Sequence, residues 1–153
     1  MGAARAPGPA ATAPWGYAYG LYAEEVDAGG AFRWTGPLAL VQIEAPAAAA
    51  ALVAEVGVSP ALRSGEPTEV RLFLSRRSSV GGEFAPADFV VREFVEDGAF
   101  TAVLDLDAMP SGSGDVLLRV EVGPAFVPAQ AGGSDDRRRL GVRLRPLRFA
   151  GSR

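Results

Sequence analysis

The 153-residue sequence contains no cysteine, histidine, lysine or asparagine, and all 15 of its basic residues are arginine. Without cysteine the chain can form no disulfide bond and supplies no thiolate. Without histidine it can form neither a Ser-His-Asp triad nor an imidazole metal site. Without lysine it lacks the amine of a Schiff base and the ammonium group of a P-loop. The chemistry that remains is that of carboxylates: a glycosidase-like acid pair, or a hard cation such as calcium.

Long apolar segments are also missing. No apolar run reaches the ~18 residues at which a membrane-spanning helix is expected, so we expect no membrane span. The first 14 residues are rich in alanine, proline and glycine and lack the apolar core of a signal peptide. We therefore expect a disordered leader over residues 1–14, one domain over residues 15–150, a tail over residues 151–153, and a cytoplasmic location.

The remaining sequence has the pattern of short strands separated by turns. Val70, Leu72 and Leu74 alternate with Arg71 and Phe73, which is the period of a strand with one buried face. Comparable runs cover residues 17–22, 32–35, 38–43, 89–95, 101–106, 118–122 and 140–149. Eight or nine such runs with Gly and Pro turns between them predict an all-β fold, an antiparallel two-sheet β-sandwich.

In two segments the strand pattern alone does not decide the secondary structure. Residues 47–51 are five alanines in a row, which favour a helix by intrinsic propensity. However, Leu52, Ala54 and Val56 continue the strand alternation, and the neighbouring strands favour a strand here as well. In the long loop over residues 124–139 we expect a short helical turn.

The aromatic residues are unevenly distributed, because all three tyrosines and both tryptophans lie between positions 15 and 34. Flat rings offer a surface for the apolar C–H faces of sugars and lose little side-chain entropy. Core packing is the alternative, and it is favoured for Trp34, which lies within a strand-like run. The predicted ligand-binding residues are Trp15, Tyr17, Tyr19, Tyr22 and Arg33.

Charge is concentrated near the C-terminal end, where residues 137–153 hold seven arginines and no acid. If the first and last strands are neighbours, these arginines can form bidentate pairs with nearby carboxylates. The predicted structural ion pairs involve Glu25, Asp136, Arg137, Arg138 and Arg139. A calcium site built from the same carboxylates is the alternative, but the arginines compete for the oxygens, and we expect no metal and no cofactor. Two adjacent aspartates and a pI of about 5.0 argue against nucleic acid as a partner.

Several short motifs occur in an ordered series. These are Tyr22-Ala23-Glu24-Glu25, Phe32-Arg33-Trp34-Thr35-Gly36-Pro37, Phe126-Val127-Pro128 and Asp136-Arg137-Arg138-Arg139-Leu140-Gly141-Val142. The series resembles small β-sandwich accessory domains associated with bacterial glycosyltransferases and surface-polysaccharide proteins. That resemblance implies a jelly-roll-like fold and an accessory role near glycan assembly, and it supplies no catalytic residues.

Two functions are consistent with these features. The first is a non-catalytic accessory module that binds a glycan or a glycan-linked protein partner of a glycan-assembly system. The second is a structural or protein-protein interaction domain without a small-molecule ligand. No motif selects an acid pair among the 18 carboxylates, so we expect no enzymatic activity. Because arginines bind carboxylates and phosphates, an acidic glycan is the expected ligand.

Overall fold

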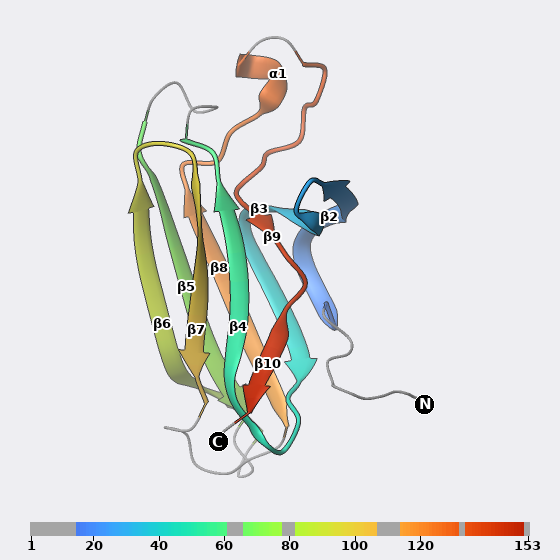
Figure 1. Cartoon of the computed structure of the whole chain (residues 1–153), viewed down its shortest axis with the longest axis vertical. Coiled ribbons are helices and arrows are strands. Elements are labelled where there is room, and N and C mark those ends of the chain that lie inside the picture. The colour runs from blue at the N-terminus through green and yellow to red at the C-terminus, as the bar shows by residue number, and fades with distance from the viewer. Residues whose placement is uncertain (1–14, 61–65, 78–81, 107–113, 132–133, 152–153) are drawn as a thin grey trace.

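The computed structural model describes residues 15–60, 66–77, 82–106, 114–131 and 134–151, and these segments are almost entirely antiparallel β-structure (Figure 1). The strands are β2 (Tyr17–Asp27), β3 (Gly30–Glu44), β4 (Ala49–Val58), β5 (Thr68–Arg77), β6 (Phe84–Phe94), β7 (Gly98–Asp105), β8 (Asp115–Gly123), β9 (Arg143–Leu144) and β10 (Arg148–Gly151). The helix in these described segments is α1 (Pro128–Ala131). The expected all-β class is thus confirmed. The predicted leader lies outside the described residues, and Gly151, expected in the tail, belongs to β10.

The strands differ from the expected two separate sheets, because hydrogen bonds join all nine into one sheet. The short strand β9 pairs with both β3 and β4 and thereby connects two halves. The sheet curls so that β4, β7 and β10 lie in front of β3, β8, β5 and β6 (Figure 1). We call β2-β3-β8-β5-β6 the first layer and β10-β4-β7 the second layer.

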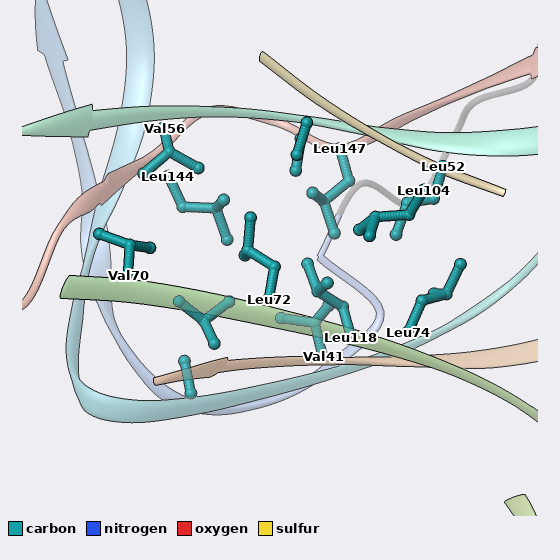
Figure 2. Close-up of a cluster of buried hydrophobic side chains, with 14 of the residues drawn as sticks. Val41, Leu52, Val56, Val70, Leu72, Leu74, Leu104, Leu118, Leu144 and Leu147 are labelled. Carbon is teal, nitrogen blue, oxygen red and sulfur yellow. The ribbon is translucent and has the colours of Figure 1, made fainter. Parts of the chain in front are cut away.

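The core lies between these layers and is formed by the inward side of each alternating strand. Val70, Leu72 and Leu74 are fully buried, as their spacing predicts. Figure 2 shows these side chains from β5 pointing toward Leu52 and Val56 of β4 across the core. Since neighbouring positions on β5 point away from this core, the outer side of the first layer is left for other roles.

The alanine-rich segment forms strand β4, which confirms the expectation of a strand. β4 pairs with β7 along one edge and with β9 and β10 along the other. This pairing on both edges, together with the burial of Leu52 and Val56, overrides the helical propensity of alanine. The expected helical turn in the long loop is also present, as α1.

The ends of the domain meet at Thr35, which is completely buried in β3. Its backbone N–H donates to the carbonyl of Val142 at 2.8 Å, and its carbonyl accepts from the N–H of Gly141 at 2.7 Å. Its hydroxyl oxygen accepts a further hydrogen bond from the N–H of Val142 at 3.1 Å. Because β2, which carries the tyrosines, pairs with β3, these bonds bring the arginine-rich segment over residues 137–145 close to β2.

Candidate functional site

The outer side of the first layer carries a row of side chains that crosses five strands. The register pairs Tyr19 with Leu40, Leu40 with Arg119, Arg119 with Phe73, and Phe73 with Phe89. Directly paired residues of antiparallel strands place their side chains on the same side of a sheet. These five residues therefore form one continuous surface, which we call the cross-strand row.

A groove of about 680 Å³ lies over most of this row. Its size falls in the range of small-molecule sites, roughly 300–1,000 Å³. The lining residues come from β3, β5, β6 and β8: Leu40, Phe73, Leu74, Ser75, Pro86, Ala87, Asp88, Phe89, Leu117, Arg119 and Glu121. Most of these side chains are apolar, with a few charged groups among them, which is the usual composition of a binding groove.

Two phenylalanines form the aromatic part of the groove. The rings of Phe73 and Phe89 stack with their centroids 6.3 Å apart and their planes inclined by 27°. Phe89 is 64% exposed, although it lies in the middle of a strand. A large apolar side chain exposed in this way, beside a second ring, provides a flat surface for an apolar ligand face.

A β-bulge shapes the wall of the groove at β6. The register shifts after Leu74, which pairs with Asp88, whereas Ser75 pairs with Pro86, so Ala87 is the extra residue. The Asp88 carboxylate fixes this bend, because it accepts hydrogen bonds from the N–H of Phe89 and from the N–H of Asp105, each at 2.8 Å. A bulge bends its strand and re-aims the adjacent side chains.

The charged groups of the face are paired with one another. Arg119 contacts Glu121 at 2.6 Å. Arg71 lies 3.5 Å from Glu121 and 3.5 Å from Glu69. Each of these arginines therefore already has a carboxylate partner on the protein.

Two of the predicted ligand-binding residues belong to this same face. Tyr17 is 83% exposed and Tyr19 is 65% exposed. Tyr17 pairs with Gln42 of β3, and Tyr19 pairs with Leu40, which lines the groove. The two tyrosine rings therefore extend the apolar surface beyond the groove, onto β2.

The structure separates the other predicted ligand-binding residues from this surface. Trp15 packs against the core, and the guanidinium of Arg33 lies 5.3 Å from the centre of its ring. The Nε of Arg33 donates to the carbonyl of Tyr22 at 2.6 Å. Tyr22 itself lies under the guanidinium of Arg138, 5.2 Å from its ring centre. The single aromatic platform expected over residues 15–34 is thus divided into an exposed pair and covered rings.

Arg138 is the centre of the predicted ion-pair region. Its guanidinium donates to both carboxylate oxygens of Asp136, with an Nη2–Oδ2 distance of 2.6 Å, and its Nη1 donates to Oε2 of Glu25 at 3.0 Å. The Tyr22 hydroxyl donates to the carbonyl of Arg139 at 3.2 Å. Within the described ranges the side chains of Arg137 and Arg139 form no ion pair.

This arrangement alters the acidity of its members. The charged hydrogen bonds from Arg138 lower the pKa of Asp136 to about 2. Asp136 in turn raises the pKa of Arg138, and Glu25 adds to that effect. Both groups are therefore held in their charged forms at neutral pH.

A second ion pair of the same kind was not predicted from the sequence. Arg145 donates to both carboxylate oxygens of Asp27, at 2.8 and 3.0 Å, and to the carbonyl of Gly30 at 3.1 Å. The hydrogen bonds from Arg145 lower the pKa of Asp27. Together, Arg138 and Arg145 tie β2 and the start of β3 to the C-terminal segment. We call these two arginines and their carboxylates the terminal clasp.

In the part of the chain that the structure describes, no group of three or more Asp or Glu side chains is placed to hold a metal ion. The carboxylates of the terminal clasp face arginines instead. The described residues also include no helix with the length and apolarity needed to cross a membrane.

The groove residues missed by the sequence analysis are Phe73, Phe89, Arg119 and Glu121. One signal was present: Phe73 lies on the outer side of an alternating strand, where a polar residue is expected. Its stacking with Phe89 depends on the register between β5 and β6, which local patterns do not supply.

No protein-family model matches the chain, and no curated protein matches it. Among solved structures it is similar to a xylanase described as Xylanase10C (mutant E385A) from Cellvibrio japonicus in complex with xylopentaose. The identity is 14% and the TM-score 0.42, over 84% of this chain and 25% of the xylanase, so the chain spans about a quarter of that protein. It is also similar to a xylan-binding module, CBM15, with 13% identity and a TM-score of 0.39 over 85% of this chain and 84% of the module.

Proposed function

We propose that this chain is a non-catalytic accessory module that binds a glycan on the outer side of its first layer. The observation that carries the proposal is the cross-strand row, in which exposed Phe89 lines a shallow, largely apolar groove and exposed Tyr19 lies beyond the groove at the other end of the row. Aromatic rings at the surface can cover the C–H face of a sugar, and nearby polar groups can bond its hydroxyls. In this proposal the curled sheet serves as a jelly-roll-like sandwich with one side reserved for the ligand.

The architecture supports this use of the first layer. The groove is built on strands held by backbone hydrogen bonds, with β3, β8 and β5 paired on both sides, so little of the backbone has to be ordered when a ligand binds. The stacking of Phe73 with Phe89 and the bulge at Ala87, which the Asp88 carboxylate holds, fix the aromatic wall before a ligand arrives. The motif series that resembles polysaccharide-associated domains is a further reason to propose a partner in glycan assembly.

The alternative function is a protein-interaction domain. It is supported by β6, which lies at the end of the strand order and exposes Phe89 and Val91, because an open edge strand can pair with a strand of another chain. Three features of this strand work against pairing with another chain. Pro86 has no N–H to donate, and the bulge at Ala87 interrupts the regular edge. Arg92, which pairs with core-facing Val70, places a charge on the edge strand. These features make the groove a better binding surface than the open edge of β6.

The test uses affinity electrophoresis and calorimetry with soluble polysaccharides of different composition. We expect at least one to retard the parent chain and the Phe89→Ala variant to lose about tenfold in affinity, a loss in the range found when an aromatic contact residue is truncated to alanine. The matched control is Val103→Ala, since Val103 is 59% exposed on β7 of the second layer. If Phe89→Ala binds as well as the parent, the groove is not the binding site. If no polysaccharide binds the parent, the interaction-domain alternative takes its place.

A further inference from the structure

We propose that the glycan bound on this face is an uncharged chain that runs across the strands, from Phe89 on β6 to Tyr19 on β2. This inference rests on the proposed function and specifies both the chemical class of the ligand and its direction. It replaces the expectation of an acidic glycan, which was based on the number of arginines in the sequence.

The charges in the groove carry the first half of the inference. Its lining contains one arginine, Arg119, and on the outer side one carboxylate, that of Glu121. Asp88 also lines the groove, but it pairs with core-facing Leu74, and its carboxylate is bonded to the N–H groups of Phe89 and Asp105. Arg119 is already bound to Glu121 at 2.6 Å. A sugar carboxylate would have to displace Glu121 from Arg119 while approaching that negative group, and like charges at close range repel. An uncharged sugar meets no such barrier, and its hydroxyls can donate to the Glu121 carboxylate.

Arg33, the arginine that the sequence predicts to bind the ligand, also has partners within the protein. Arg33 donates to the Tyr22 carbonyl and stacks on Trp15. Arg71, next to the groove, is shared between Glu69 and Glu121. No arginine of this face therefore stands without a carboxylate or carbonyl partner among the residues that the structure describes.

The positions of the aromatic rings indicate the direction in which the glycan chain would run. Neighbouring strands are about 4.8 Å apart, so four strand intervals place Tyr19 on the order of 19 Å from Phe89. A chain that follows this row meets rings at both ends. A chain that follows β5 instead would pass Glu69, Arg71 and Ser75 and meet a single ring, Phe73. The path across the strands is thus the one that offers repeated apolar contact.

The charge of the ligand is tested with two sets of soluble polysaccharides. The uncharged set is hydroxyethyl cellulose, arabinoxylan and galactomannan, and the acidic set is polygalacturonate and alginate. We expect binding to the uncharged set only, with an affinity that does not change between low and high sodium chloride. Binding only to the acidic set would overturn the inference and leave the proposed function standing. Binding to neither set would overturn both.

A charge variant sharpens this test. Glu121→Gln removes the carboxylate that pairs with Arg119, and Glu96→Gln is the control, since Glu96 is exposed outside the groove. Because this change removes the carboxylate that repels an acidic sugar and leaves Arg119 without its partner of the 2.6 Å ion pair, we expect Glu121→Gln to gain measurable, salt-sensitive binding of the acidic set, whereas Glu96→Gln should bind as the parent does. If Glu121→Gln still excludes the acidic set, the charge of Glu121 does not select an uncharged ligand. A parent protein that already binds alginate as tightly as arabinoxylan would contradict the inference.

The direction is tested by chain length, with cello- and xylo-oligosaccharides from disaccharide to hexasaccharide. We expect Phe89→Ala to weaken every length that binds. The double change Tyr17→Ala and Tyr19→Ala should weaken the hexasaccharide about tenfold and leave the shortest ligand unchanged. Because both tyrosines are largely exposed, thermal melting should show these variants folded. If the double variant binds the hexasaccharide as the parent does, the ligand does not reach β2 and the proposed direction is wrong.

Discussion

Arg138 shows how single residues hold the two ends of this domain together. It bonds Asp136 from its own segment and Glu25 from β2, and it covers the ring of Tyr22. The guanidinium is planar and can bind two carboxylates at once, whereas a lysine in its place would offer one point charge. The clasp is partly exposed, so its contribution to stability is limited by solvent screening.

We therefore expect Arg138→Ala to lower Tm by about 2–4 °C, the change that a loss of about 1 kcal/mol produces in a domain of this size. Arg137→Ala is the matched control, because the neighbouring side chain is exposed and forms no ion pair within the described residues. Differential scanning calorimetry distinguishes the two variants. Equal Tm values for both would show that the contacts of Arg138 do not contribute to stability.

The pKa of Asp136 predicts a pH dependence. Its folded value of about 2 lies below the ordinary value near 3.9, so the folded state favours the carboxylate. The stabilisation is complete above the unfolded pKa and is lost as the pH falls from about 4 toward 2. Asp136→Asn should be less stable than the parent at pH 7, and the difference in Tm should shrink over that interval. A difference that stayed constant between neutral and acidic pH would contradict this account.

At the level of elements, β2 depends on a glycine. Gly20 has φ of +78°, and a Cβ at this position would collide with the carbonyl oxygen of Leu38. The register of β2 on β3 shifts immediately after Tyr19, so Gly20 separates the exposed tyrosines from the covered Tyr22. Only glycine allows this close approach together with the left-handed conformation.

Gly20→Ala should therefore cost at least about 1–2 kcal/mol, the strain of a left-handed residue that carries a side chain. Gly123→Ala serves as the control, because a Cβ there meets nothing within 4 Å. Chemical denaturation measures both variants. If Gly20→Ala unfolds at the same denaturant concentration as Gly123→Ala, the proposed constraint on β2 is absent.

Two consecutive residues of β5 have different surroundings, so we expect one to contribute to the stability of the fold and the other to the proposed ligand binding. Leu72 is fully buried in the core, whereas the next residue, Phe73, lies in the groove. Leu72→Ala should lower the free energy of unfolding by about 2–5 kcal/mol, the usual cost of emptying a core site. If the groove binds a glycan as proposed, Phe73→Ala should remove most of that affinity with a smaller effect on stability. Denaturation and calorimetry on the same two variants test this, and a reversed order of effects would refute it.

The same strand explains how much the sequence can predict. The alternation of Val70, Leu72 and Leu74 is local, so it reveals both the strand and its buried side. The strand over the alanine-rich segment could be favoured for the same reason, through Leu52 and Val56. In contrast, the pairing of Phe73 with Phe89 depends on register between strands, and the bulge at Ala87 shifts that register by one residue.

For the whole molecule, the curled sheet determines which side chains meet. The closure through β9 brings Asp27 to Arg145 and Glu25 to Arg138, although these residues are separated by more than 110 positions. The sequence indicated that arginines near one end could pair with acids near the other, but it could not indicate which arginine. The first layer likewise assembles the cross-strand row from two pairs of consecutive strands, β2-β3 and β5-β6, which β8 joins from a later part of the chain.

The most direct test of the binding face is the change in backbone amide NMR signals on titration with xylo- or cellohexaose, whichever binds in calorimetry. The account predicts shifts concentrated on the first layer, at Tyr19, Leu40, Arg119, Phe73 and Phe89, with the second layer unchanged. Shifts confined to the second layer or to the terminal clasp would contradict the assignment of the cross-strand row as the glycan-binding face.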